Sequence, residues 1–234
     1  MNEQTDITSL YYQRFKGRNN EIKRRDLQWG WTLRAIGDMR SFDSLDIGSG
    51  SGKYSIAMKD RFQANCSALD LFPEPPLNLS ELDIDYRQGS ADSLPWSDNR
   101  FDLVLALSVI FYLPNPAEGI SEIARVLKPG GRAIISGHTL YSWPTAYRLI
   151  LRRLRPSKVK HLDGVVFRDV DYYLNAINQA ELNTVGLGGF SNRRQLNFSV
   201  PNALTPYPRN PITLMSKLIA RHRYHFIIEA KKPV

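Results

Sequence analysis

Short apolar runs alternate along this chain with segments whose apolar residues recur every three or four positions. The first pattern predicts buried strands, and the second predicts helices that rest one face on a sheet. The predicted strands cover residues 44–47, 66–70, 84–88, 101–108, 132–137, 184–190 and 224–230. The predicted helices cover residues 4–15, 21–38, 53–62, 116–127, 142–154 and 170–182. Strands that alternate with helices favour right-handed crossovers and a parallel sheet with helices on both faces.

The loop between the first predicted strand and the next helix is rich in glycine. Gly48, Gly50 and Gly52 alternate with serines, and Lys53 opens the helix. Glycine lets bare backbone approach a ligand and permits positive φ angles, and the helix aims its N-terminal N–H groups at the loop. Asp70 ends the second predicted strand, where a carboxylate can accept from both hydroxyls of a ribose. The pattern indicates a nucleotide cofactor.

Glycine spacing and one acidic side chain narrow the choice of cofactor. A dinucleotide site favours G-x-G-x-x-G with a pyrophosphate on the helix N-terminus. In this chain, Lys53 stands at the position of the third glycine of that motif. Asp46 stands just before the loop, where a carboxylate suits a ligand with positive charge and disfavours a pyrophosphate. No G-x-x-x-x-G-K-[ST] motif occurs, which excludes a P-loop. A nicotinamide oxidoreductase is therefore disfavoured.

Five segments, all within residues 44–137, carry motifs in a fixed order: 45–52, 68–70, 89–96, 101–104 and 125–132. Together they resemble the class I S-adenosylmethionine (SAM)-dependent methyltransferases. The most similar branch is the group of small-molecule enzymes that includes the ubiquinone and menaquinone C-methyltransferases. The resemblance implies an α/β fold with a Rossmann-like, seven-stranded, mostly parallel sheet. It also implies helices on both faces, an antiparallel last strand and an N-terminal helical lid.

The resemblance also implies which residues meet the cofactor. Asp46 is expected near the methionine ammonium, Asp70 at the ribose hydroxyls, and Ser108 at the sulfonium. The whole expected set is Asp46, Gly48, Ser49, Gly50, Asp70, Leu71, Ala91, Asp92, Ser93 and Ser108. Turn capping by Asp92 and a plain strand-end role for Asp70 are the alternatives. SAM is the expected cofactor and S-adenosylhomocysteine its product, and no metal is implied because the donor already carries the activation.

The acceptor is expected at the carboxyl ends of the fourth and fifth strands, where open α/β sheets keep their ligands. Relatives often have histidine before Leu-Pro where this chain has Phe111 and Tyr112. Tyr112 is a candidate to orient an acceptor or take a proton, with packing as the alternative. His138 follows the fifth strand and is the first candidate for a general base, with a structural or solvent-facing role as the alternative. His161 ranks next, and an acidic acceptor needs no base.

Composition fits one globular domain of 234 residues, with 42% apolar and 23% charged residues. We expect a lid over 1–40, a SAM-binding core over 41–137 and an acceptor-side part over 138–234 with an insertion at about 191–223. Aromatic residues of the lid, Tyr11, Tyr12 and Trp31, are candidates to touch ligand or to anchor the helices. The polar N-terminus and a single cysteine predict a cytoplasmic protein.

Charge is uneven along the chain. Residues 1–137 hold 16 basic and 18 acidic residues, whereas residues 138–234 hold 15 basic and 5 acidic ones. The densest cluster is Arg148, Arg152, Arg153, Arg155, Lys158 and Lys160. It suits an acidic group on a substrate, an anionic membrane surface, or plain solvation. Nucleic acid is disfavoured because no recognisable nucleic-acid-binding module occurs.

We therefore expect methyl transfer to an oxygen or carbon atom of a small or medium-sized organic acceptor. An anionic or lipid-like acceptor follows from the basic second half. The alternatives are a lipid methyltransferase at a membrane surface and a non-catalytic SAM-binding protein, because fold alone does not give function.

Overall fold

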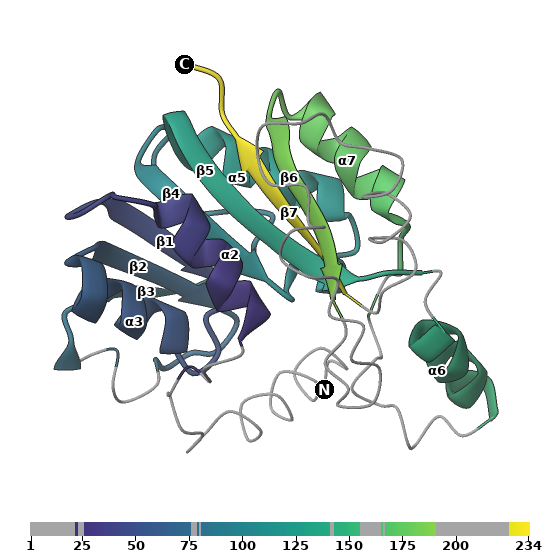
Figure 1. The fold of residues 1–234 in the computed structure, drawn as a ribbon. Helices are drawn as coiled ribbons and strands as arrows, with labels where there is room; N and C mark the ends of the chain where they lie inside the picture. Colours follow the sequence, from purple (N-terminus) through teal and green to yellow (C-terminus); the bar gives the residue numbers. More distant parts are fainter. Residues whose placement is uncertain are drawn as a thin grey trace.

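The structure, a computed structural model, is built around a seven-stranded sheet with strand order β3-β2-β1-β4-β5-β7-β6 (Figure 1). It describes residues 22, 26–75, 79, 81–140, 143–154, 165, 167–190 and 225–234. The strands are β1 (Asp43–Ile47), β2 (Asn65–Asp70), β3 (Asp85–Gln88), β4 (Phe101–Leu107), β5 (Leu127–His138), β6 (Asn183–Phe190) and β7 (His225–Lys231). The helices are α2 (Leu27–Ile36), α3 (Lys53–Phe62), α5 (Pro116–Val126), α6 (Trp143–Leu154) and α7 (Val170–Gln179), with a 3-10 turn η1 (Ile110–Tyr112).

The directions of the strands bring several strand ends to one edge of the sheet. The pairs β1–β2, β1–β4, β2–β3 and β4–β5 are parallel, and β7 runs antiparallel to both β5 and β6. The carboxyl ends of β1, β2, β4 and β5 therefore meet at one edge, together with the amino end of β7. The predicted mostly parallel sheet with an antiparallel last strand is confirmed.

Two apolar layers cover the two faces of the sheet, because side chains alternate along each strand. On β4, Leu103 and Leu105 pack with α2 and α3, whereas Val104 and Ala106 pack with α5 and α7. All four of these side chains are buried. Burial on both faces explains why β4 is apolar from Leu103 to Leu107 and could be predicted from its sequence.

Helix α2 is fixed to the sheet by an aromatic anchor. Asp26 caps the helix and accepts from the Trp29 backbone N–H at 3.1 Å. Trp31 is 6% exposed and lies against β6 so closely that a Cβ at Gly186 or Gly188 would come within 2.9 or 2.7 Å of its ring. This favours the anchoring interpretation for Trp31. The predicted helix over 4–15, with Tyr11 and Tyr12, lies outside the described residues.

The segment over 129–131, between the predicted helix over 116–127 and the predicted strand over 132–137, lies within β5. Leu127 already pairs with Phe101 of β4, and the register shifts before regular pairing resumes. Gly130 adopts φ 79° and donates its backbone N–H to the Lys232 carbonyl at 3.0 Å. The contact between Gly130 and Lys232, about a hundred residues apart in sequence, therefore helps to extend the strand, and no local pattern predicts this contact.

Candidate cofactor and acceptor site

The glycine-rich loop after β1 is held against the ends of two strands. Gly48, Gly50 and Gly52 have φ angles of 67°, 56° and 72°. The backbone N–H groups of Gly48 and Ser49 donate to the Leu69 carbonyl at 2.7 and 3.1 Å. A Cβ at Gly48 would meet the side chain of Val109, beyond β4, at 2.6 Å. Glycine is thus required at position 48 both for its φ angle and for this close approach.

Asp70 joins the loop to the end of β2. Its carboxylate accepts from the backbone N–H of Gly50 and from that of Leu71, each at 2.8 Å. Burial raises the pKa of Asp70 above its ordinary value, while these backbone donors act in the opposite direction. The Leu71 side chain beside it is 47% exposed. A carboxylate and an apolar surface therefore lie together next to the loop.

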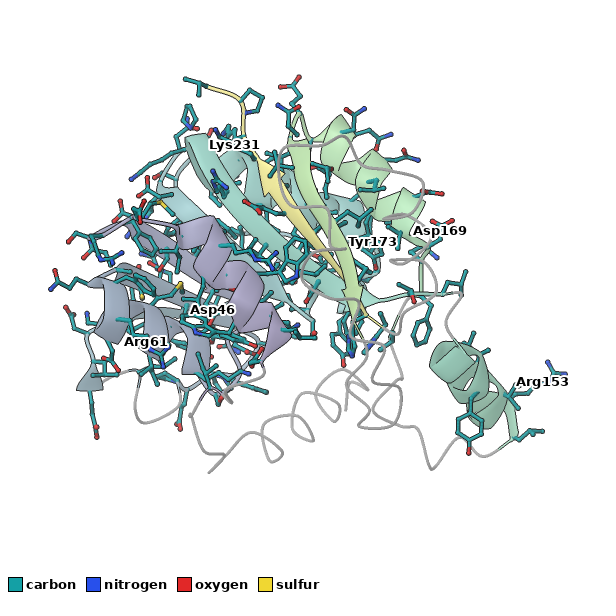
Figure 2. The ribbon with its side chains drawn as sticks, viewed as in Figure 1. Asp46, Arg61, Arg153, Asp169, Tyr173 and Lys231 are labelled. Atoms are coloured by element: carbon teal, nitrogen blue, oxygen red, sulfur yellow. The ribbon has the colours of Figure 1, made fainter. Side chains whose placement is uncertain are left out.

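Asp46 places a second carboxylate beneath the same loop (Figure 2). Its side chain is 2% exposed and accepts from the Ser55 hydroxyl at 2.9 Å. Burial raises the pKa of Asp46 to about 7, the hydrogen bond from Ser55 opposes this, and the charge of Asp70 raises it further. Two carboxylates that disfavour each other's charge make this edge a poor site for an anion and a suitable one for a cation.

The turn after β3 comes to the same edge. The Gly89 backbone N–H donates to the Asp70 carbonyl at 2.9 Å, which ties this turn to the end of β2. Ala91 is 4% exposed, Asp92 is half-buried and Ser93 is exposed. The structure therefore brings these three predicted residues to the neighbourhood of Asp70.

A hydrogen-bond network links α2 to the ends of β4 and β5. Ser108 has φ 62° and donates its backbone N–H to the Ser136 carbonyl and hydroxyl, each at 3.1 Å. The Gln28 side-chain amide donates to the hydroxyls of Ser108 and Ser136 at 3.0 and 2.7 Å. Its carbonyl accepts from the Tyr54 hydroxyl at 3.1 Å, and that hydroxyl also bonds Asp26. Sequence reasoning missed Gln28, because nothing local indicates which way it points.

Two further predicted residues, His138 and Tyr112, meet in an aromatic cluster at the end of β5. The Phe111 ring lies 4.5 Å, centroid to centroid, from both Tyr112 and His138. The His138 ring also lies 4.5 Å from that of His225 and 6.4 Å from that of Phe167. His138 is half-buried and His225 is 6% exposed. The cluster combines two imidazoles with three flat aromatic surfaces.

His225 is the second residue that sequence reasoning missed. It pairs with His138 across the antiparallel β5–β7 ladder, so the two side chains start from directly opposed positions. The expected antiparallel last strand could have indicated His225, since the beginning of that strand must lie opposite the end of the fifth strand, where His138 stands. His161 lies outside the described residues.

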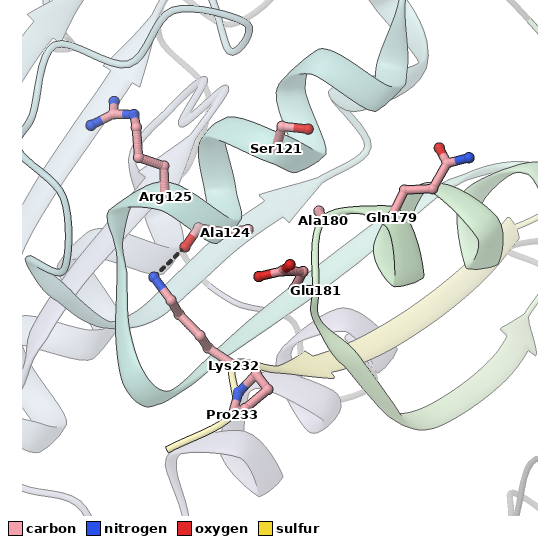
Figure 3. A pocket seen from close by; sticks show the side chains of 8 residues that line it. All are labelled: Ser121, Ala124, Arg125, Gln179, Ala180, Glu181, Lys232 and Pro233. Atoms are coloured by element: carbon pink, nitrogen blue, oxygen red, sulfur yellow. Dashed lines mark hydrogen bonds between the residues drawn. The ribbon is translucent and has the colours of Figure 1, made fainter.

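A surface pocket elsewhere is not part of this site. Figure 3 shows it between the ends of α5 and α7 and the C-terminal segment, at the opposite edge of the sheet. Its two cations are engaged within the protein. Lys232 donates to the carbonyls of Ala124 and Leu127, both at 2.8 Å, and Arg125 pairs with Glu122 at 2.7 Å. Within the described part of the chain, no group of three His, Cys, Asp or Glu side chains could hold a metal ion.

Comparisons with known proteins agree with this architecture. Residues 45–135 match the family model described as a methyltransferase domain. The demethylmenaquinone methyltransferase of Lactiplantibacillus plantarum is 36% identical over 100 residues, which are 38% of this chain and 42% of that protein. The ubiquinone biosynthesis O-methyltransferase of Xanthomonas oryzae pv. oryzae is 31% identical over 152 residues, which are 62% of this chain and 60% of that protein.

One solved structure extends the likeness of fold to nearly the whole chain. It is phosphoethanolamine N-methyltransferase 2 of Haemonchus contortus in complex with S-adenosyl-L-methionine, with a TM-score of 0.67 at 17% identity. The match covers 98% of this chain and 57% of that one. At this identity the likeness concerns the fold alone.

The order of motifs, the sheet and these matches identify a methyltransferase domain of the class I SAM-dependent type within this chain. Its methyltransferase domain is the part over residues 45–135. The chain spans about half the length of the curated relatives it matches.

Proposed function

We propose that this protein transfers a methyl group from SAM to an oxygen or carbon atom of a small or medium-sized organic acceptor. One observation carries the proposal. The sheet edge that holds the glycine-rich loop and Asp70 also holds the imidazole pair of His138 and His225. Ser108 connects the two parts. Its backbone N–H donates to Ser136 of β5, and His138 lies two residues after Ser136 on that strand.

The described residues fit SAM in charge and in shape. SAM carries an ammonium and a sulfonium, and the carboxylates of Asp46 and Asp70 complement positive charge. The buried hydroxyl of Ser49, in the middle of the loop, makes no hydrogen bond with any described residue and is available to a ligand. Exposed Leu71 offers an apolar surface to the adenine, whose edge can be read by Ala91, Asp92 and Ser93.

Each cofactor contact then has a role in this proposal. Gly48 and Gly50 let the backbone approach the methionine part, and Asp46 faces the ammonium. Asp70 accepts from the ribose hydroxyls, which replace or join the backbone donors that it has now. Ser108, just after the end of β4, would lie beside the sulfonium, and its bond to Ser136 ties this position to the strand that carries His138.

When bound, SAM supplies a methyl carbon already activated for displacement, and the protein need only orient the acceptor and move one proton. Holding the two reactants in line can supply roughly 7–11 kcal/mol. His138 would accept the proton of an acceptor hydroxyl at a ring nitrogen, which would leave that oxygen able to attack the methyl donor. Two imidazolium charges as close as His138 and His225 repel each other, which favours at least one neutral ring that can act as a base. Tyr112 orients the acceptor.

The walls of the cluster favour a flat acceptor. The rings of Phe111 and Phe167 lie beside His138, the Tyr112 ring lies against Phe111, and aromatic faces stabilise stacked or edge-on rings. The similarity to relatives named for demethylmenaquinone and ubiquinone biosynthesis supports the same class of acceptor. We therefore propose a ring-bearing acceptor with an ionisable hydroxyl as the preferred substrate.

The test is incubation with SAM labelled on its methyl group and a cell extract freed of protein. Wild-type protein should label a small molecule that can be extracted and identified, and Asp70→Ala should label nothing. His138→Ala should bind S-adenosylhomocysteine like the wild type but label the product 10²–10⁴-fold more slowly, the range typical of a lost general base. A wild-type protein that binds the cofactor but labels no compound would establish the non-catalytic alternative and overturn the proposal.

A further inference from the structure

Helix α6 exposes an apolar stripe. Tyr147, Ile150 and Leu154 are spaced by three and four residues, which puts them on one side of the helix. Tyr147 and Ile150 are each 54% exposed and Leu154 is 71% exposed, although each belongs to a residue type that folding normally buries. Figure 1 shows α6 standing apart from the sheet and from α5 and α7. The stripe is therefore not part of the apolar core that packs on the sheet.

Basic residues accompany the stripe. Positions 148 and 152 fall on a different side of an ideal helix from the apolar positions, and Arg153 is exposed at the outer end of α6 (Figure 2). In the sequence, three more basic residues follow by position 160, and no acidic residue occurs from 139 to 162. The region of α6 is thus rich in positive charge beside the apolar stripe, and Leu149, 38% exposed, adds further apolar surface.

The geometry points to an anionic lipid bilayer as the surface that covers this stripe, and we propose that α6 docks the protein there. Aromatic and aliphatic residues on one side with arginines on the other are the composition of helices that lie in the interface of a membrane. A nucleic acid would engage the arginines but leave Tyr147, Ile150 and Leu154 in water. A polar protein surface would leave them equally uncovered.

The length of α6 fixes its orientation. Twelve residues extend about 18 Å, short of the ~30 Å hydrocarbon core, so α6 lies in the plane of the interface. Among the described residues, no helix is long and apolar enough to span a membrane. Docking therefore depends on two additive contributions, burial of the stripe and attraction of the arginines to anionic headgroups.

Sedimentation with lipid vesicles separates these contributions. The full-length protein is mixed with vesicles of phosphatidylcholine, or of phosphatidylcholine and phosphatidylglycerol in equal amounts. We expect sedimentation with the anionic vesicles only, weakened by salt. Ile150→Ser with Leu154→Ser removes apolar area and should weaken partitioning more than 100-fold. Arg152→Gln with Arg153→Gln removes two charges worth about 1 kcal/mol each near the surface, or about 30-fold together.

Leu27→Ser is the matched control, because Leu27 is 48% exposed but lies on α2, and it should sediment like the wild type. Leu27, Ile150, Arg153 and Leu154 are exposed, so circular dichroism and titration with S-adenosylhomocysteine should show an intact fold and cofactor site in every variant. The proposal is overturned if the wild type ignores anionic vesicles, binds both vesicle types equally, or partitions like either α6 variant. The titration reports the cofactor site separately, so failure of docking is distinguishable from failure of the proposed function.

Discussion

Replacing Asp46 by Asn should make the protein more stable in the pH range where it works, while weakening its cofactor site. Asp46 is 2% exposed, and burial raises its pKa to about 7 from an ordinary 3.8. In the unfolded chain this carboxyl loses its proton near pH 4, whereas in the folded protein it does so near pH 7. Between these values the unfolded state binds fewer protons, so the free energy of unfolding falls as the pH rises.

The size of the effect follows from the two pKa values. A difference of one pKa unit is equivalent to about 1.4 kcal/mol, so ionisable Asp46 costs the wild type about 4 kcal/mol above pH 7. About 2 kcal/mol of this develops between pH 5 and pH 7, and about 3 kcal/mol between pH 5 and pH 8. Asparagine cannot ionise but can still accept from the Ser55 hydroxyl. Any cost of burying its amide is the same at both pH values and cancels from the comparison.

The assay is urea unfolding of both proteins at pH 5 and pH 8. The stability of Asp46→Asn relative to the wild type should rise by about 3 kcal/mol from the lower to the higher pH. Asp43→Asn, on the same strand, is the control of opposite sign. The pKa of Asp43 is lowered by Lys128 at 2.7 Å against the effect of burial, so this variant should lose stability at neutral pH. The loss should stay below about 1 kcal/mol because the pair is partly exposed.

The same substitution should weaken SAM binding. A cationic ligand favours the ionised form of Asp46, so binding near pH 7 should release a proton, which calorimetry in buffers of different ionisation enthalpy detects. Asp46→Asn should abolish that release. A stability difference that does not change between pH 5 and pH 8 would refute the reasoning, because it would mean that Asp46 ionises normally in the folded protein.

Three further predictions concern residues that the structure ties together. Gln28→Ala removes the donor to the hydroxyls of Ser108 and Ser136, so we expect weaker S-adenosylhomocysteine binding by calorimetry at unchanged helix content. His225→Ala should lower kcat at least tenfold without changing SAM affinity; an unchanged kcat in steady-state kinetics would remove His225 from the mechanism. Gly188→Ala forces a Cβ to 2.7 Å from Trp31 and should cost about 1–3 kcal/mol in urea unfolding. The matched Gly30→Ala, which meets nothing within 4 Å inside α2, should instead stabilise the protein by about 1 kcal/mol.

Local chemistry explains which elements could be predicted from the sequence. The helix over 53–62 has the predicted bounds because Gly52 at φ 72° starts it and Gln63 at φ 56° ends it. The strand over 101–107 was predictable because all of its side chains except that of Asp102 enter one of the two apolar layers. In both cases the deciding interactions lie within a few residues or follow directly from a periodic pattern.

What the sequence did not reveal depends on contacts between distant segments. Gln28 reaches hydroxyls 80 and 108 residues further along the chain, and no local pattern indicates its direction. His225 becomes interesting only through its register with His138 across β5 and β7. The strand character of 127–131 depends likewise on Lys232 at the far end of the chain. The motifs predict the cofactor edge and the position of His138, whereas the pairing of His138 with His225 depends on the fold.

The most direct test of the central claim is calorimetric titration of S-adenosylhomocysteine into the wild type, Asp70→Ala and Asp60→Ala. Asp60 is an exposed residue in the last turn of α3 and serves as the matched control. We expect S-adenosylhomocysteine to bind the wild type and Asp60→Ala but not Asp70→Ala. In the wild type, the Asp70 carboxylate lies 2.8 Å from the Gly50 backbone nitrogen. Equal binding to all three proteins, or none to the folded wild type, would contradict a cofactor site at this edge of the sheet.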